Sequence, residues 1–518
     1  MPSYLTPGVY VEEVQSGARP IEGVGTAVAA FVGFAEQGPF HSPTLVTNWD
    51  QYVQNFGGFT EGTYLAHSVY GYFANGGGTA YVVRVGGPSD QVDGGKPAPI
   101  QAPAPVAIGG FLVSAKAGAG AEVSVEIADA DGDNPPEDRF KLIVRQAGEV
   151  VETYDASIRK NVKGYLLNQV RQSKFVVVAE QPGTAQTKPE KQTHALAAAA
   201  PAATPAAKGP GGGVARLDPN EYVGDSAART GFGGLEAIDE ITMVAVPDLM
   251  SAYQRGEIDD EGLRTVQLAV ISHCEQMGDR VAVLDSPPQM NAQKIRTWRQ
   301  DEAGYDSRYA TLYYPWISVF DPATGRNKTV PPSGHVAGVW ARSDGERGVH
   351  KAPANEVIRG AVDLEIKLSK GEQDLLNPIG VNCVRAFPGR GIRIWGARTL
   401  SSDPAWRYLN VRRLFNYLEE SILLGTQWVV FEPNDDRLWS SIRRNVTAFL
   451  SEEWRRGALF GSTPSEAFYV KCDRDNNPQE SVDLGQVICE IGVAPVKPAE
   501  FVIFRLSQFS DSTSLVNE

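Results

Sequence analysis

Two low-complexity stretches constrain how this chain can fold more than any other feature of its sequence. Residues 86–110 and 181–215 are rich in Ala, Pro and Gly, a composition typical of solvated linkers. Between them, residues 111–180 alternate apolar runs such as AEVSVEIA and FKLIVRQ with one short helical pattern. Because linkers join this small α/β segment at both ends, we expect an inserted domain that projects outward from a larger one.

The segments on either side of the insertion predict one discontinuous domain. Helical patterns lie at residues 49–56, 64–73 and 260–277. Strand patterns lie at residues 26–35, 79–85, 241–248, 280–288, 309–322 and 381–387. Strands that alternate with helices at this spacing predict a partly parallel sheet covered by helices. We therefore expect a multidomain α/β (α+β) protein with mixed sheets and flanking helices.

The last part of the chain has a different pattern. Helical periodicity covers residues 406–425, with Ser402 or Asp403 as the expected cap, and again residues 435–457. Strands are predicted at residues 427–433, 486–496 and 500–509. The expected domains are an N-terminal strand and connector (1–25), a middle domain (26–85 plus 216–390), a linker (86–110), the insertion (111–180), a second linker (181–215) and a C-terminal domain (391–518).

Composition disfavours several classes of partner. The formal net charge of -14 repels phosphate backbones and anionic lipids, so nucleic acid is a poor candidate. The cysteines, Cys274, Cys383, Cys472 and Cys489, have no framework spacing, which predicts free thiols in a reducing compartment. The N-terminus lacks the basic and apolar regions of a signal peptide, and no apolar run approaches the ~18 residues that span a bilayer. We expect no direct membrane insertion.

No motif predicts catalysis, cofactor binding or metal binding. The sequence lacks a P-loop, an HExxH pair and a GxSxG elbow. The adjacent His273 and Cys274 could form a base and thiol nucleophile, but Cys274 lies on an apolar helical stripe, which favours core packing; the stripe contains Leu263, Val266, Val270, Cys274 and Met277. Residues 473–484 resemble a calcium loop, but Pro478 and Leu484 replace its glycine and bidentate glutamate. The Gly-rich residues 333–355 favour an ordered loop packed by Val339 and Trp340, and their alternative interpretation is an enzyme site.

One charged feature remains. On the second C-terminal helix, Arg437, Arg444 and Arg455 project within ~20° of one another, opposite its apolar face. Residues 390–456 carry 11 basic and 8 acidic side chains within an acidic protein. This basic stripe is either a solvated face or a docking surface for an acidic partner.

Four blocks in order along the chain resemble contractile tail sheath proteins. They are PGVYVEEV (7–14), VPPSGHVAGVWARSDGERGVHKAPAN (330–355), WGARTLSSDPAWRYLNVRRLFNYLEESI (395–422) and IGVAPVKPAEFVIFRLSQF (491–509). Such proteins occur in contractile phage tails, R-type bacteriocins and phage-tail-like contractile injection systems. The resemblance covers residues 1–85 and 216–509, and leaves out the insertion.

The resemblance implies a structural role and no enzyme activity. A sheath subunit forms stacked hexameric rings around an inner tube and contracts without nucleotide hydrolysis, driving the tube through a target envelope. Its implied partners are further copies of itself, the inner tube protein, and baseplate and terminator or cap proteins. Its implied location is the cytoplasm of the producing bacterium, within a tail or tail-like particle that lysis releases. An α/β enzyme and a static tubular shell are the alternative functions.

The resemblance also implies that terminal strands are exchanged between subunits. The N-terminal strand would use Val9, Tyr10, Val11 and Val14, and the C-terminal strand Val502, Phe504 and Leu506. Gly17, Pro20, Gly23 and Gly25 make the intervening segment a poor strand and a good connector. Strand exchange would supply partners for the backbone groups of both segments. The alternative is that both strands close a sheet within their own subunit. For a sheath subunit, we hypothesise that the basic stripe of Arg437, Arg444 and Arg455 is the surface that faces the inner tube.

Overall fold

A computed structural model describes residues 20–86, residues 217–504 and most of residues 106–195. The chain divides into two compact units, one made of residues 1–89 and 215–518 and the other of residues 90–214. Each unit is described by itself below. Among the described residues, no helix is both long enough and apolar enough to cross a membrane.

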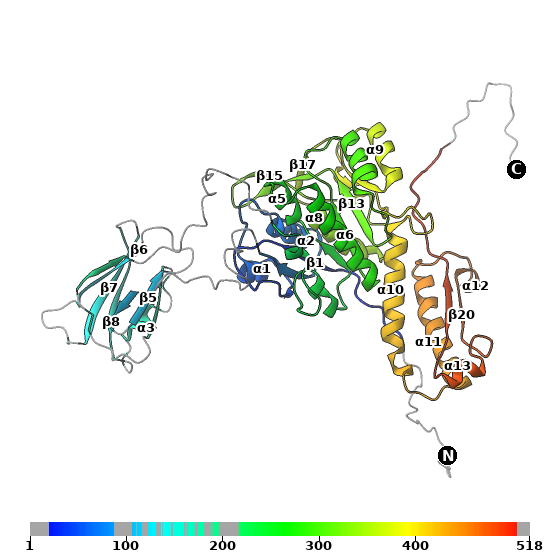
Figure 1. Ribbon diagram of the computed structural model, residues 1–518, viewed down its shortest axis with the longest axis horizontal. Helices are drawn as coiled ribbons and strands as arrows, with labels where there is room; N and C mark the ends of the chain where they lie inside the picture. Colours follow the sequence, from blue (N-terminus) through cyan, green and yellow to red (C-terminus); the bar gives the residue numbers. More distant parts are fainter. Residues whose placement is uncertain are drawn as a thin grey trace, which may run out of the picture. The chain divides into compact units, whose positions relative to one another are not determined.

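A nine-stranded sheet is the centre of the first unit (Figure 1). β1 (Val28–Gly33) pairs in parallel with both β3 and β11, so strands from before and after the insertion lie side by side. The order across the sheet is β16 (Glu356–Val357), β19 (Gly391–Ile394), β18 (Val381–Phe387), β13 (Ala310–Tyr314), β12 (Val281–Asp285), β11 (Met243–Ala245), β1, β3 (Thr79–Arg84) and β2 (Thr44–Val46). Its five central pairings, from β3 to β18, are parallel, which confirms the expected mixed α/β fold.

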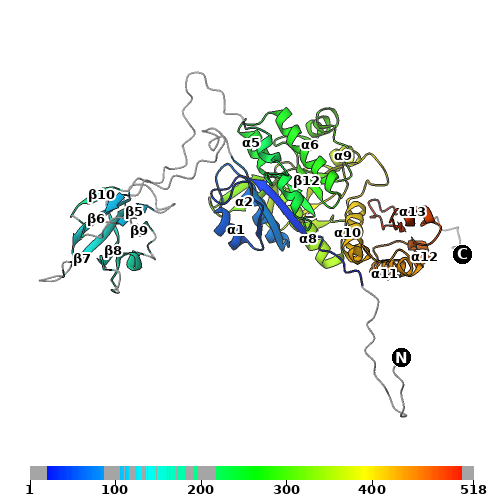
Figure 2. The same ribbon diagram turned by 60° about the horizontal axis from the view of Figure 1, so that its bottom comes forward.

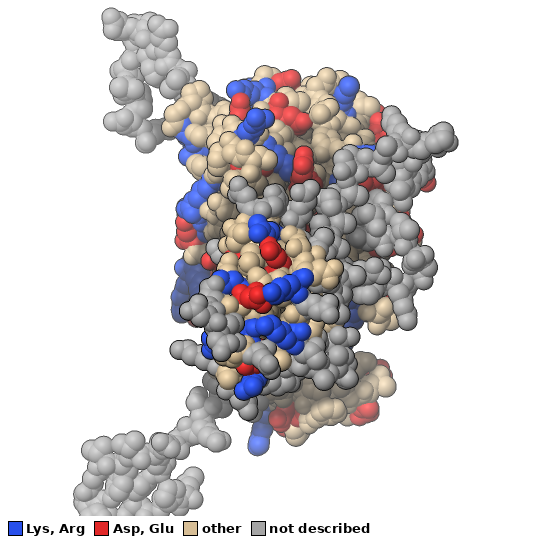
Figure 3. All heavy atoms as spheres, turned by 90° about the vertical axis from the view of Figure 1, so that its left-hand side faces the viewer, with Lys and Arg blue, Asp and Glu red and all other residues tan. Residues whose placement is uncertain are grey.

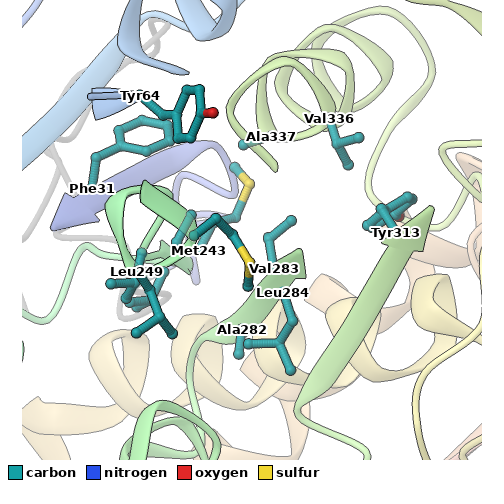
Figure 4. Packing of buried hydrophobic residues seen from close by; sticks show 14 of the residues in the cluster. Phe31, Tyr64, Met243, Leu249, Ala282, Val283, Leu284, Tyr313, Val336 and Ala337 are labelled. Carbon is teal, nitrogen blue, oxygen red and sulfur yellow. The ribbon is translucent and has the colours of Figure 1, made fainter. Parts of the chain in front are cut away.

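Helices cover this sheet and bury its strands. They are α1 (Trp49–Phe56), α2 (Leu65–Asn75), α4 (Asn220–Val223), α5 (Asp248–Gln254), α6 (Asp260–Met277), α7 (Ala292–Thr297), α8 (Ser333–Arg347) and α9 (Lys370–Leu376). Every residue of β12 and β13 is buried, as expected for parallel strands covered on both faces. In Figure 4, Phe31 and Tyr64, Met243 and Leu249, and side chains of β12 and α8 pack into one continuous core.

The Gly-rich segment from Ser333 forms a helix, so the expected loop is wrong. Glycine disfavours helices, but here it permits a close contact between α8 and α2. A Cβ on Gly334 would lie 2.4 Å from Ser68 Cα, and one on Gly338 would lie 2.4 Å from the Tyr72 carbonyl oxygen. Val339 and Trp340 are fully buried, as the sequence indicates. The glycines therefore serve helix packing.

A smaller sheet lies beside the large one, with the order β15 (Arg326–Val330), β14 (Ile317–Asp321) and β17 (Ala361–Leu364). The second unit has two sheets with a core of their own. One contains β10 (Thr193–Ala195), β6 (Val123–Asp129), β7 (Arg139–Gln146) and β8 (Glu149–Ser157); the other contains β4 (Val106–Ile108), β5 (Phe111–Ala115) and β9 (Val176–Glu180). α3 (Leu166–Val170) packs against β8 and β9.

The C-terminal region has a separate apolar core within the first unit. It contains α10 (Leu409–Thr426), α11 (Asp436–Arg455), α12 (Pro464–Ala467), β20 (Phe468–Lys471), α13 (Gln479–Asp483) and β21 (Glu490–Val493). Figure 2 shows α11, α12 and α13 grouped beyond α10, on the side away from the large sheet. β20 and β21 pair antiparallel. Two predictions are wrong here. Residues 427–429 form a 3₁₀ turn instead of a strand, and neither Ser402 nor Asp403 caps α10, which begins after Tyr408.

Two buried carboxylates fix helix ends at the carboxyl edge of the parallel strands. Asp248 accepts hydrogen bonds from the amides of Phe34, Tyr64 and Leu65, and thereby holds the start of α2. Asp285, the last residue of β12, accepts from the Ser333 amide (2.9 Å) and hydroxyl (2.6 Å) at the start of α8. Burial raises the pKa of Asp248 to about 6 and the pKa of Asp285 to about 7. Both side chains act as structural caps.

The raised pKa of Asp285 predicts a pH-dependent stability. Between the unfolded pKa of ~3.9 and the folded pKa near 7, the folded protein binds more protons than the unfolded chain, so its unfolding free energy falls as pH rises. Asp285→Asn removes this titration; its amide oxygen can still accept from the Ser333 amide, and its amide nitrogen can donate to the Ser333 hydroxyl. The stability of the wild type relative to this variant should therefore decrease between pH 5 and pH 8, as measured by urea denaturation.

Asp306 provides a matched control. Its carboxylate also accepts from a serine amide and hydroxyl, those of Ser402, but it is exposed and these bonds lower its pKa. Asp306→Asn should therefore leave a constant difference from the wild type over the same pH range. Equal pH slopes for the two variants would contradict the assignment to Asp285.

Candidate assembly surfaces in the C-terminal region

α11 presents one apolar and one basic face. Its buried apolar side chains recur at helical spacing, and Asn445 and Glu453 are buried with them; the apolar ones are Leu438, Trp439, Ile442, Val446, Phe449 and Leu450. Asp435 caps the helix by accepting hydrogen bonds from the amides of Arg437 and Leu438. A capped amphipathic helix of this length has a fixed orientation, so its outer face is a defined surface.

The basic stripe of Arg437, Arg444 and Arg455 lies on this outer face. All three side chains are exposed, and within residues 20–86 and 217–504 none forms an ion pair. Neighbouring arginines differ, because Arg456 pairs with Glu452 and Glu453. By contrast, basic and acidic side chains are interspersed on the face of the molecule in Figure 3. The stripe is therefore a row of uncompensated positive charge.

The segment after β21 ends in exposed apolar residues. Ala494 pairs with Ala467 and Phe460 through backbone hydrogen bonds, and Glu500 forms an ion pair with Arg398. The chain then leaves the surface. The exposed fractions of Phe501, Val502, Ile503 and Phe504 are 74%, 67%, 78% and 84%.

The predicted C-terminal strand is not closed within its own subunit in the described part of the chain. Phe501–Phe504 belong to no strand there, and Leu506 lies outside the described residues. The two-stranded β20–β21 sheet also has unpaired edges among the described residues. Consecutive exposed apolar side chains and open sheet edges are both unusual in an isolated globular protein.

The predicted N-terminal strand residues, Val9, Tyr10, Val11 and Val14, lie outside the described residues, as does Gly17 of the connector. From Pro20 onward the connector is described and lies along α10. Ile21 is buried against Gly425, and the Val24 amide donates to the Ser421 hydroxyl at 3.1 Å. A Cβ on Gly23 would lie 2.1 Å from the Tyr417 hydroxyl, whereas one on Gly25 would have no neighbour within 4 Å. The sequence predicts the same connector role for both glycines, but in the structure only Gly23 lies too close to another side chain to carry a Cβ.

A buried ion pair joins the connector to the region of the large sheet and to the C-terminal region. Arg413 of α10 donates to both carboxylate oxygens of Asp344 on α8, at 2.9 and 2.5 Å. Arg413 also donates to the Thr26 carbonyl, and the Thr26 hydroxyl donates to Asp344. Both charged side chains are at most 5% exposed. The sequence gives no signal for this pairing, because its three members are far apart in the chain.

The interpretation of residues 333–355 as an enzyme site has no geometric support. Ser333 and Asp285 are hydrogen-bonded to each other but fully or almost fully buried, so no substrate reaches them. Burial lowers the pKa of His335 to about 4 and that of His273 to about 4, and raises the pKa of Cys274. Among the residues that the structure describes, no three His, Cys, Asp or Glu side chains are grouped to hold a metal ion.

Comparison with known proteins gives concordant matches. The family description "Phage tail sheath protein central domain" matches residues 228–400, and "Phage tail sheath C-terminal domain" matches residues 401–509. The tail sheath protein of Vibrio phage KVP40 is 29% identical over 262 residues, which cover 46% of this chain and 38% of the relative. A putative prophage major tail sheath protein of Pseudomonas aeruginosa is 26% identical over 251 residues, covering 47% of this chain and 62% of the relative. The chain thus spans between 38% and 62% of these relatives.

Solved structures show the same fold over nearly the whole chain. The contracted helical sheath of the anti-feeding prophage has a TM-score of 0.60 and 23% identity, covering 98% of this chain and 100% of the other. The contracted sheath complex of an extracellular contractile injection system, PVC, has a TM-score of 0.58 and 24% identity, covering 98% and 99%.

The contact between the connector and α10 predicts different effects for two neighbouring glycines. In Gly23→Ala, the new methyl group overlaps with Tyr417, so residues 21–26 should separate from α10. The Val24 amide should then exchange with deuterium at least tenfold faster, because loss of ~1.4 kcal/mol of docking energy suffices. Gly25→Ala should leave exchange unchanged. Equal exchange rates in both variants would contradict the close contact.

Proposed function

Because the chain belongs to the phage tail sheath protein family, we propose that it is the repeating subunit of a contractile sheath in a phage tail or tail-like particle. Copies form stacked hexameric rings around an inner tube, and contraction drives this tube through a target envelope without nucleotide hydrolysis. The observation that carries the proposal is the exposed apolar segment Phe501–Phe504, which follows the unpaired edges of a two-stranded sheet. Such a subunit is incomplete without neighbours.

Exchange of terminal strands between copies explains this segment. A neighbour's sheet edge would satisfy its backbone amides and carbonyls, and burial of the apolar side chains would add ~25 cal/mol per Å². Val502 and Phe504 share one face of an extended segment, which would pack with the core beneath β20 and β21. Residues Val9–Val14 are the corresponding N-terminal strand. Several such hydrogen bonds together would keep neighbouring subunits tied during movement.

The connector transmits displacement between subunits. Pro20 precedes the segment of residues 21–26 that is docked on α10, so a pull on the N-terminal strand acts first on this contact. The Asp344–Arg413 pair then holds Thr26 to both α8 and α10. Gly17 precedes the docked segment in sequence, and Gly25 belongs to it. Only residues before Ile21 then serve as the spacer.

The basic stripe faces the inner tube. Its three arginines lack ion-pair partners among the described residues and project from a rigid helix, so they are available to acidic groups on a partner. Exposed ion pairs contribute only ~0.2–1 kcal/mol each. Weak contacts repeated over many subunits hold an extended sheath and can still be released together on contraction.

Electron microscopy of the assembled purified protein tests the proposed function. Purified protein should form long tubes in electron micrographs, with two diameters that correspond to extended and contracted packing. Discrete small oligomers would contradict a sheath, and a single diameter under all conditions would indicate a static shell. Baseplate and cap proteins would set where the tubes begin and end.

The two faces of the C-terminal segment provide the variants for this assay. Val502→Ser/Phe504→Ser removes apolar side chains from the face proposed to be buried and should abolish tubes, whereas the subunit keeps its melting temperature because both residues are exposed in it. Phe501→Ser/Ile503→Ser makes a similar change on the opposite face and should retain more assembly. If both double variants assemble like the wild type, the segment is not an exchanged strand.

Reversal of the basic stripe should separate sheath assembly from tube binding. Arg437→Glu/Arg444→Glu/Arg455→Glu leaves the apolar face of α11 intact, so the subunit should fold normally. In particles co-expressed with the inner tube, the variant should give mostly empty, contracted sheaths, because like charges now face each other.

The matched control changes Arg229, Lys294 and Lys370 to Glu. These residues are also exposed and lie outside the C-terminal region, so the total charge changes equally. Control particles should remain filled and extended. Filled, extended particles from the stripe variant would refute the assignment, and empty particles from both variants would show a general effect of charge.

A further inference from the structure

Two cysteines lie opposite each other in the C-terminal sheet. β20 and β21 are antiparallel, with Phe468 opposite Val493 and Lys471 opposite Glu490. One further step in the same register places Cys472 opposite Cys489. Although 16 residues separate them in sequence, the fold makes them direct cross-strand neighbours.

Their position in the ladder suits a disulfide. The Ala494 amide donates to the Ala467 carbonyl at 2.8 Å, so this facing pair is a hydrogen-bonded one. Because facing pairs alternate between hydrogen-bonded and non-hydrogen-bonded along an antiparallel ladder, Cys472 and Cys489 fall at a non-hydrogen-bonded position. Facing Cα atoms at such a position are ~4.5 Å apart, within the ~4.4–6.8 Å that disulfides span.

The two thiols influence each other. Both side chains belong to the apolar C-terminal core. The interaction with Cys489 lowers the pKa of Cys472, whose thiolate Arg443 also favours, and the same interaction raises the pKa of Cys489. Cys472 is fully buried, whereas Cys489 is partly exposed and reachable from solvent.

The surrounding loop fixes both positions. Asn477 is 2% exposed and both donates to the Ile488 carbonyl and accepts from the Ile488 amide. Arg443 of α11 donates to the Cys472 carbonyl at 3.2 Å. The residues next to each cysteine are therefore held before any covalent bond forms, so little backbone movement is needed.

We propose that Cys472 and Cys489 are a redox-active pair that forms a reversible disulfide between β20 and β21. The oxidant class is a small-molecule disulfide such as glutathione disulfide. The Cys489 thiol, which solvent reaches, gives its proton to the Cys472 thiolate as it attacks one sulfur of glutathione disulfide, so that a mixed disulfide forms and one glutathione thiolate leaves. Cys472 then passes this proton to the released glutathione thiolate, and its sulfur attacks Cys489 Sγ and releases the second glutathione. The cysteines lose two protons and two electrons, and glutathione disulfide gains them as two thiols.

The disulfide also has a mechanical consequence, which rests on the proposed strand exchange. A pull on the segment after Val493 would separate β21 from β20 starting at the Phe468–Val493 end. The cysteines lie beyond the opposite end, past Lys471 and Glu490. The bond would therefore stop this separation before it reaches the loop of residues 473–488.

The test uses the purified full-length protein before and after incubation with glutathione disulfide. Under denaturing conditions, the number of titratable thiols should fall from four to two. Peptide mapping without reduction should find Cys472 linked to Cys489, with Cys274 and Cys383 still reduced because they are buried in the large core. The melting temperature of the C-terminal region should rise by several degrees and return after reduction.

Two single variants provide the controls. Cys489→Ser should yield no intramolecular link, whereas Cys383→Ser should yield the same link and rise in melting temperature as the wild type. Four free thiols after oxidation, or only mixed disulfides with glutathione, would overturn the proposal.

An assembly assay distinguishes failure of the redox proposal from failure of the proposed sheath function. Oxidised tubes should resist dissociation by urea to a higher concentration than reduced tubes, and Cys489→Ser tubes should show no such difference. If the disulfide forms but the protein never forms tubes, strand exchange fails and the redox pair stands. If tubes form but the thiols stay free, the redox pair fails and the sheath function stands.

Discussion

The buried ion pair between Asp344 and Arg413 is the interaction on which the arrangement of the first unit depends. It joins α8, which packs against the large sheet, to α10, which begins the C-terminal region, and it holds the connector at Thr26. Removing one member of such a pair leaves an uncompensated buried charge, which costs ~3–5 kcal/mol. The cation also lies 4.8 Å from the centre of the Trp340 ring. One polar contact therefore aligns three segments that are distant in sequence.

This junction supports the strand-exchange proposal, because it fixes the connector to the body of the subunit. The connector is docked on α10, and the C-terminal segment is anchored through Arg398 and Glu500, so the chain is held near both ends of the described part. After Glu500, the apolar side chains of Phe501–Phe504 are exposed in the single chain. The large sheet supplies rigidity, because its central strands are covered on both faces. Rigid bodies joined by paired strands can adopt two packings without refolding.

Much of the fold could be predicted from local sequence. The periodicity of residues 49–56 and 260–277 matches α1 and α6 residue for residue, because amphipathic spacing and Asn48 and Asp259 caps act locally. The parallel sheet followed from the strand–helix order. Predictions were wrong where a tertiary contact outweighs local preference. Gly334 and Gly338 lie in a helix because they allow α8 to approach α2. Residues 427–429 form a turn in which Trp428 and Val429 pack against the C-terminal core, despite the β-branched valine.

The features of the candidate surfaces also divide into those set by local sequence and those set by tertiary contacts. The sequence by itself determined the basic stripe, since helical spacing alone places Arg437, Arg444 and Arg455 on one face, and it determined the apolar C-terminal segment. Only the tertiary structure decided that Gly23 contacts Tyr417 while Gly25 does not, that Arg413 pairs with Asp344, and that Cys472 faces Cys489. The physical reason is the distance along the chain between the residues that interact. Periodicity and caps are set within a few residues, whereas these contacts depend on chain segments that only folding brings together.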